Sequence, residues 1–104
     1  YMINAVYVIF ARKGKAVSIN YCGSQTVHTF INPTGDREHP TQKPVDLMRL
    51  YIENSSQPGD LVLDPFMGSG STGVAALAAG RRFHGIEIDP VYYAVVCRRM
   101  GVMP

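Results

Sequence analysis

Apolar positions in the second half of the chain alternate between short continuous runs and segments with helical spacing. Residues 61–64 (LVLD) and 82–89 (RFHGIEID) are bounded by turn or acidic residues, which predicts two buried parallel strands. Residues 71–80 (STGVAALAAG) and 90–100 (PVYYAVVCRRM) predict two helices. The order strand, helix, strand, helix predicts one right-handed parallel crossover followed by a second helix, as in a doubly wound α/β sheet.

Both predicted helices carry end signals. Ser71 or Thr72 is expected to cap the first helix, and Gly80 to end it. Pro90 suits the first turn of the second helix because its missing N–H would have no partner there. The basic pair at 98–99 suits a helix C-terminus.

The first sixty residues have a weaker pattern. Residues 4–11 (NAVYVIFA) predict a buried strand, and residues 16–20 (AVSIN) alternate as a second, weaker strand. Residues 20–42 have no stable period and are expected to form a long loop. A helix is expected to begin at Pro44 and to end at the breakers of residues 55–60.

Composition adds limits on class and compartment. The 104 residues suffice for one small domain or a piece of a larger one, and the initial Tyr1 favours a piece. The net charge of +2 is compatible with nucleic-acid contact without arguing for it, and we expect the basic clusters, Arg81–Arg82 among them, to be solvated surface. The cysteines have no metal-site spacing, so no metal is expected. No apolar run could cross a bilayer, and the expected location is the cytoplasm.

The strongest local motif is DPFMGSGSTG, residues 64–73. It fits G-x-G-x-x-G at Gly68, Gly70 and Gly73, a spacing that exceeds what a tight strand-to-helix turn needs. A phosphate-binding Walker loop is excluded, because Val74 stands where that loop has lysine. A dinucleotide site is the closer alternative.

Two acidic residues bear on this alternative: one fits a dinucleotide, and the other argues against it. Glu87 stands near the end of the second predicted strand, where an acid would bind a ribose. Asp64 stands at the tip of the first strand, with three residues between it and Gly68. Its carboxylate would repel a pyrophosphate and attract a nearby ammonium group. The ligand should therefore carry a ribose and a cationic centre, and S-adenosylmethionine has both.

Three segments carry a family resemblance: HPTQKPVDLM (39–48), PGDLVLDPFMGSGSTGVAALAAGRRFHGIEID (58–89) and YY (92–93). They resemble the S-adenosylmethionine-binding half of the DNA amino-methyltransferases, the N6-adenine and N4-cytosine enzymes. The resemblance is to the subgroup whose cofactor segments lie C-terminal to the catalytic segment. It implies an α/β fold, namely a C-terminal fragment of the Rossmann-like methyltransferase domain, with parallel strand–helix–strand–helix and an N-terminal strand or hairpin. Residues 1–38 would form a late strand or hairpin and a loop of that sheet, and residues 39–104 the cofactor half.

The resemblance also implies residue roles. Asp64 and the backbone of the following loop would surround the methionine part of the cofactor, and Glu87 would accept hydrogen bonds from both ribose hydroxyls. The stretch 39–44 would close over the methionine end, although Lys43 is equally explained as an exposed lysine and His39 as a loop-packing residue. His28 and His84 are expected to be structural. The full set of expected cofactor-binding residues is Thr41, Gln42, Lys43, Asp64, Pro65, Phe66, Met67, Gly68, Ser69, Gly70 and Glu87.

The chain lacks the motif on which this family's chemistry depends. That motif is a polar residue followed by Pro-Pro and an aromatic, which holds a base flipped out of the duplex. The sequence contains no Pro-Pro pair, and we reject DPFM (64–67) and DPVY (89–92) as substitutes. We therefore expect that the chain is truncated at its N-terminus and is inactive alone. We also expect the strand at 61–64 to expose an apolar edge, so that the chain is marginally stable or is held by the missing part of the enzyme or by a partner chain. DNA would be the partner of the full-length enzyme.

Two alternatives stay open. The chain could be a non-catalytic methyltransferase remnant that binds DNA or a partner, or a fragment of an NAD-type oxidoreductase. The target base, adenine or cytosine, and the recognition sequence also stay open. The loop at 20–38 is the stretch of this chain that could contact DNA.

Overall fold

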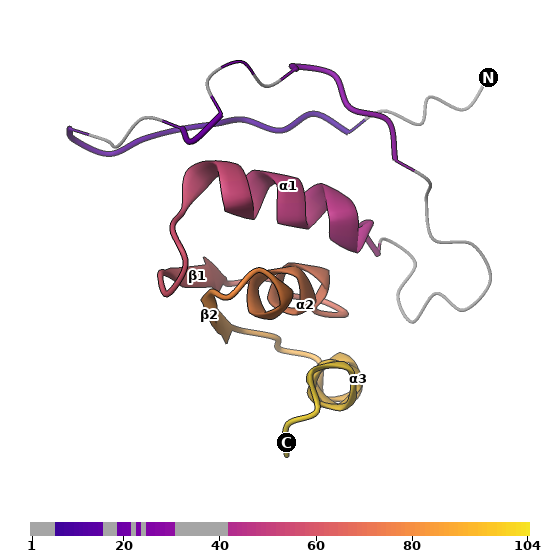
Figure 1. The fold of residues 1–104 in the computed structure, drawn as a ribbon. Helices are drawn as coiled ribbons and strands as arrows, with labels where there is room; N and C mark the ends of the chain where they lie inside the picture. The colour runs from indigo at the N-terminus through magenta and orange to yellow at the C-terminus, as the bar shows by residue number, and fades with distance from the viewer. Residues whose placement is uncertain (1–5, 16–18, 22, 24, 31–41) are drawn as a thin grey trace, which may run out of the picture.

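The computed structural model describes residues 6–15, 19–21, 23, 25–30 and 42–104. Its elements are the helix α1 (Val45–Ser55), the strand β1 (Leu61–Asp64), the helix α2 (Ser71–Ala78), the strand β2 (Arg82–Gly85) and the helix α3 (Pro90–Met100). The predicted order strand, helix, strand, helix is confirmed. In Figure 1, the sheet and α2 lie in the middle, with α1 on one side of them and α3 on the other.

The sheet consists of β1 and β2, which pair in parallel with Leu61 opposite Arg82 and Asp64 opposite Gly85. Ile86 donates its N–H to the Asp64 carbonyl at 2.9 Å, one step beyond the last pair. The pairing then stops because β1 ends in the turn that begins with Pro65. The strand predicted over 82–89 is therefore shorter, and residues 86–89 follow it as a connection to α3.

One face of the sheet packs on α2. The buried centre is formed by Ile52, Ala75 and Ala76, with Val45, Met48, Val62, Ala79 and Phe83 packed against it. Small residues on α2 allow this close approach. A Cβ added to Gly73 would lie 2.6 Å from the Phe83 ring and 1.9 Å from Met100 Cε.

The opposite face of the sheet is bare. On this face Leu61 and Leu63 of β1 are 57% and 61% exposed, and their partners Arg82 and His84 of β2 are exposed as well. No strand pairs with the other edge of β1 among the described residues. The sequence predicted an exposed apolar edge on this strand; among the described residues that edge has no partner strand, and Leu61 and Leu63 beside it are exposed.

The N-terminal segment departs from the prediction. A strand was expected over 4–11, but residues 6–11 form none, and residues 4 and 5 lie outside the described residues. Tyr7 and Ile9 are 92% and 91% exposed. A strand needs a hydrogen-bonded neighbour, and Figure 1 shows this indigo segment lying over α1, away from the sheet. Of the strand expected at 16–20, residues 19 and 20 are not in a strand, and 16–18 lie outside the described residues.

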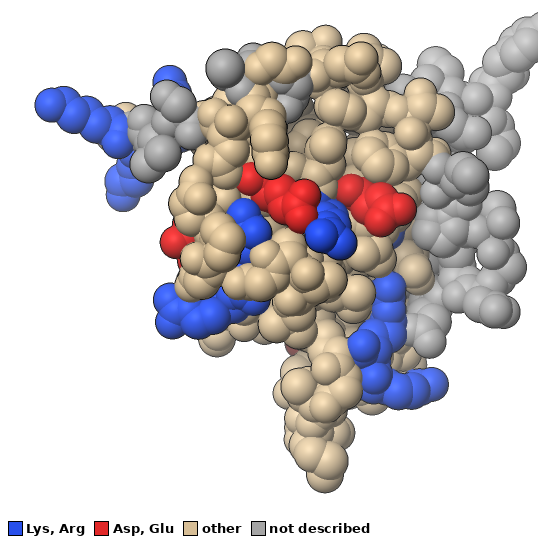
Figure 2. Space-filling model, viewed as in Figure 1, with Lys and Arg blue, Asp and Glu red and all other residues tan. Residues whose placement is uncertain are grey.

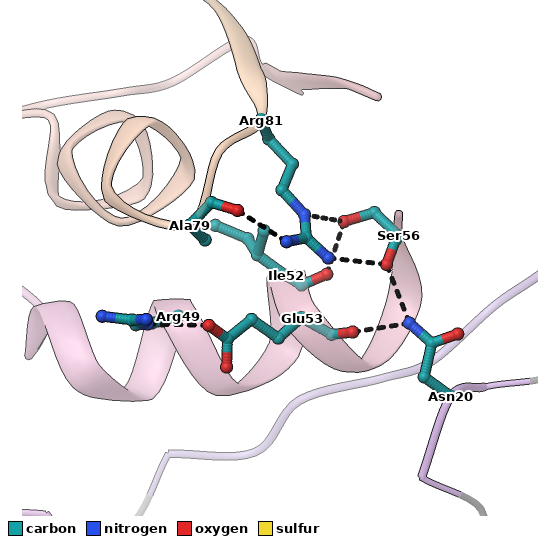
Figure 3. Close-up of polar contacts among 7 residues, drawn as sticks. All are labelled: Asn20, Arg49, Ile52, Glu53, Ser56, Ala79 and Arg81. Carbon is teal, nitrogen blue, oxygen red and sulfur yellow. Dashed lines mark hydrogen bonds and ion pairs between the residues drawn. The ribbon is translucent and has the colours of Figure 1, made fainter. Parts of the chain in front are cut away.

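Asn20 attaches this segment to the C-terminal end of α1. Its side-chain amide donates to the carbonyls of Glu53 at 2.7 Å and Ser56 at 2.8 Å (Figure 3). Its own side-chain oxygen accepts from Gln57 at 2.6 Å. His28 lies farther along, edge-on to the Tyr51 ring at a centroid distance of 6.4 Å. Asn20 thus satisfies carbonyls that the end of a helix would leave without partners.

Arg81 joins α1 to the turn between α2 and β2. Its guanidinium donates to the Ser56 hydroxyl at 3.0 Å, the Ser56 carbonyl at 2.8 Å and the Ala79 carbonyl at 2.6 Å (Figure 3). The residue is only 8% exposed, so the expectation of a solvated arginine was wrong here. The C-terminal ends of two helices meet at this point, and their partial negative charge favours a buried cation.

The ends of α3 follow the prediction. Pro90 is its first residue, and the Asp89 carboxylate caps it by accepting from the Val91 N–H at 2.8 Å. Gly101 ends it in the left-handed conformation at φ 67°. None of the helices in the described part of the chain is long and apolar enough to cross a membrane.

Candidate cofactor-binding site

A cavity of about 300 Å³ opens at the carboxyl ends of β1 and β2, where parallel sheets usually bind ligands. It brings together most of the residues expected from the sequence: Gln42, Lys43, Asp64, Phe66, Met67, Gly68, Ser69 and Glu87. Pro65 and Gly70 do not line it, and Thr41 lies outside the described residues. Sequence reasoning missed three lining residues: Met48, Ser71 and Thr72.

Glu87, two residues after the end of β2, holds the glycine loop in place. Its Oε2 accepts from the Gly68 N–H at 2.9 Å, and its Oε1 accepts from the Asp89 N–H at 2.9 Å. A carboxylate oxygen can accept more than one hydrogen bond, so each retains capacity for a ligand hydroxyl. The side chain is half-buried at the cavity wall, held in place before any ligand arrives.

Asp64 occupies the tip of β1 and lines the same cavity as Glu87. Its Oδ1 accepts from the Phe66 N–H at 3.1 Å, which turns the chain away from the sheet. Its Oδ2 has no donor among the described residues. Two carboxylates therefore face the cavity from neighbouring strand ends, and Lys43 lines it from the segment before α1.

The three glycines of the G-x-G-x-x-G pattern have different roles. Gly68, at φ 53°, lines the cavity and offers its N–H to Glu87. Gly70 adopts φ 80°, and a Cβ there would lie 2.9 Å from Val96 of α3. Gly73 is required for packing against Phe83 and Met100. Of these three glycines, only Gly68 lines the cavity, where a ligand could contact it. The G-x-G-x-x-G spacing therefore reflects the packing of α2 and α3 as much as the binding of a ligand.

The N-terminus of α2 has no side-chain cap. The cap position is taken by Gly70, whose left-handed conformation no serine or threonine adopts easily. The expectation that Ser71 or Thr72 caps this helix was therefore wrong, because Ser71 is already its first helical residue. Ser71 is only 6% exposed, and its Oγ has no hydrogen-bond partner among the residues that the structure describes.

Arg99 reaches the same loop from α3. Its Nη1 donates to the Ser69 carbonyl at 2.5 Å, and the residue is half-buried. The pair at 98–99 lies in the last turn of α3 as expected, but Arg99 also positions the loop. The loop is thus held by Glu87, just after β2, and by Arg99 of α3.

A family model described as DNA methylase, covering the N6 and N4 enzymes, matches residues 11–98. The chain belongs to this family. The match begins in the N-terminal segment and ends within α3, so it includes β1, β2 and the whole cavity.

Individual members of the DNA methylase family are similar to large parts of this chain. The DNA adenine methyltransferase YhdJ of Escherichia coli (strain K12) is 55% identical over 64 residues, which are 62% of this chain and 22% of that protein. The crystal structure of the M1.HpyAVI–SAM complex has a TM-score of 0.67 at 34% identity and covers 82% of this chain and 44% of that one. The PvuII DNA methyltransferase, described as cytosine-N4-specific, has a TM-score of 0.58 at 35% identity, over 61% of this chain and 22% of its own.

These proteins are much longer than the chain. The chain spans between 22% and 31% of the curated relatives it matches. The likeness to solved members confirms the predicted α/β methyltransferase fold, with parallel strands and helices.

Proposed function

We propose that the chain is the S-adenosylmethionine-binding part of a DNA methyltransferase that methylates an exocyclic amine, N6 of adenine or N4 of cytosine. The observation that carries this proposal is the cavity. The segment before α1, the glycine loop and the end of β2 all contribute to it, although they lie far apart in the sequence. A solved relative of the same fold is a complex with this cofactor.

The lining residues fit the chemical groups of the cofactor. The volume of about 300 Å³ is at the small end of ligand pockets, as expected for a cavity with one open side. Glu87 has acceptor capacity for ribose hydroxyls, and Asp64 has a carboxylate oxygen for an ammonium group. Met48 and Met67 supply apolar wall.

The cofactor would bring a methyl group activated by its sulfonium, and this chain's residues would orient it. We propose that Asp64 and the loop from Pro65 to Gly70 hold the methionine part and Glu87 the ribose. Gln42 and Lys43 would close the methionine end, together with Thr41. Within this set, Pro65 and Gly70 would act through the shape of the loop, since neither lines the cavity.

Base binding and DNA contact are proposed to depend on other parts of the enzyme or on a partner chain. The sequence has no Pro-Pro pair to receive a flipped base. Figure 2 shows acidic side chains in a row across the face that carries α1, with basic side chains among and around them. A face of mixed charge offers DNA phosphates little net attraction. We therefore propose that the chain alone does not methylate DNA. We also propose that the complete enzyme acts in the cytoplasm.

Calorimetric titration of the purified chain with S-adenosylhomocysteine and with NADH tests the cofactor assignment. We expect S-adenosylhomocysteine to bind and NADH not to bind. A Glu87→Gln variant should lose about tenfold or more in affinity, because it exchanges a charged acceptor of the ribose and the loop for a neutral one. Binding of NADH, or of neither compound, would refute the assignment. Methylation of DNA by the chain alone would refute its proposed inactivity.

A further inference from the structure

Residues 12–15 (RKGK) form an exposed turn, called the basic turn below. Arg12, Lys13 and Lys15 place three positive charges on four residues, and all four residues are exposed. Gly14 adopts the left-handed conformation at φ 68°, so the chain changes direction there. A Cβ added to Gly14 would meet no atom within 4 Å. The turn therefore stands clear of the described part of the molecule at this point.

The basic turn has no acidic neighbour along the chain. The first Asp or Glu of the sequence is Asp36, so residues 1–35 carry a formal charge of +3 with His neutral, all of it on this turn. All eight Asp and Glu lie in the rest of the chain, together with the other seven Lys and Arg. Among the described residues, the ion pair lies on α1, between Arg49 and Glu53. The positive charge of the turn is therefore open to a partner.

The position of the basic turn separates it from the face of mixed charge. In Figure 1 the indigo segment runs along α1 and reaches one end of the molecule. Figure 2, drawn from the same side, shows basic side chains that project beyond the surface at that end. On the face that carries α1, by contrast, acidic and basic side chains are mixed. A projecting cluster of one sign attracts a polyanion more strongly than a mixed face does.

We propose that the basic turn contacts the phosphate backbone of DNA. This inference rests on the proposed function, and the contact adds to those that other parts of the enzyme make. Phosphates follow one another about every 3.4 Å of axis along each DNA strand. Consecutive Cα atoms are about 3.8 Å apart, so the three cations are close enough together to reach successive phosphates. Such contacts hold a protein on the duplex without reading its sequence.

The test measures how salt weakens binding of the full chain to a fluorescently labelled DNA duplex, followed by anisotropy. Each phosphate contact contributes about −0.9 to the slope of log affinity against log salt concentration. With three contacts, the wild-type chain should lose about 40-fold in affinity between about 50 and 200 mM salt. Arg12→Gln should reduce this loss to about 12-fold, and the double variant Lys13→Gln/Lys15→Gln should reduce it to about 3.5-fold.

The double variant Arg82→Gln/Arg98→Gln is the matched control. It also removes two charges from exposed residues, on β2 and α3, and should keep the loss of about 40-fold. The thermal midpoint of Lys13→Gln/Lys15→Gln should equal that of the wild-type chain, because the turn is exposed. Equal reductions of the salt dependence in the two double variants would show an effect of net charge and overturn the inference.

The remaining outcomes also decide. Failure of the wild-type chain to bind the duplex at about 50 mM salt would overturn the inference. Vesicles that contain phosphatidylglycerol form a second arm, since lipid headgroups also carry phosphate. Binding to vesicles and not to the duplex, with the same dependence on Lys13 and Lys15, would assign the turn to a membrane surface and overturn the contact with DNA.

Titration with S-adenosylhomocysteine separates this inference from the proposed function. All variants should bind this compound as the wild-type chain does, because none of the substituted residues lines the cavity. If the wild-type chain binds it and the turn variants keep the full salt dependence on DNA, this inference alone fails. If the wild-type chain does not bind it, the proposed function fails, whatever the result with DNA.

Discussion

Replacing Arg81 by leucine should destabilise the chain strongly, because this side chain joins α1 to the turn between α2 and β2. Leucine keeps an apolar body in the buried site but removes the guanidinium with its three hydrogen bonds. The Ser56 carbonyl keeps its bond from Asn20 at 2.8 Å, whereas the Ala79 carbonyl loses the donor at 2.6 Å. The attachment between the two helix ends would therefore depend on apolar contacts.

The magnitude follows from the number of charged hydrogen bonds and the cost of burying a cation. Each hydrogen bond to a charged group contributes about 1.5–3 kcal/mol, and the desolvation of the buried guanidinium offsets part of the sum. We expect the free energy of unfolding to fall by about 2–4 kcal/mol, a large share of a small domain's stability. Urea unfolding followed by circular dichroism measures this change.

Arg82 provides the matched control for this experiment. It is the next residue, it is exposed, and its Nε donates to the Gly59 carbonyl at 3.0 Å. Arg82→Leu removes the same charge from the surface and should cost less than about 1 kcal/mol. Equal losses in the two variants would refute the reasoning, since the effect would then come from net charge or composition and not from the buried contacts.

Two further substitutions test the packing of the sheet. Gly73→Ala should lower the free energy of unfolding by about 1–3 kcal/mol in urea titrations, because its Cβ would overlap Met100 and Phe83. Gly23→Ala is the control, since no atom lies within 4 Å of the added Cβ. A Gly73→Ala variant as stable as the wild-type chain would contradict the packing. Leu63→Lys, on the bare face, should leave the thermal midpoint nearly unchanged and reduce the light scattering that comes from aggregation. Val62→Lys, on the face toward α2, should unfold the chain. Equal tolerance at both positions would show that the two faces are wrongly assigned.

The sequence predicted the part of the fold whose signals are local. The apolar runs, Pro90 and the glycine loop identify β1, α2, β2 and α3, because each depends on neighbours a few residues away. The strand expected over 4–11 failed for the opposite reason. Its residues have strand propensity, but pairing needs a neighbouring strand, and none lies beside residues 6–11 among the described residues.

Side chains whose role depends on three-dimensional contacts were also missed. Arg81 looks like any basic surface residue until the ends of two helices converge on it. Met48 sits on the apolar face of α1, and its place in the cavity depends on how α1 packs on α2. Ser71 was assigned to a cap because the left-handed turn at Gly70, which takes that position, is not visible in the order of residues.

The contacts that hold the glycine loop lie between residues 68 and 99. Glu87 holds Gly68, Arg99 holds the Ser69 carbonyl, and Gly70 packs against Val96, so the loop geometry depends on β2 and α3. The exposed apolar side chains Leu61 and Leu63 lie on β1, and the outer edge of this strand has no partner among the described residues. The cavity can therefore be preorganised by these contacts, whereas we propose that catalysis depends on other parts of the enzyme or on a partner chain. This separation is why we expect the chain to bind the cofactor and not to transfer its methyl group.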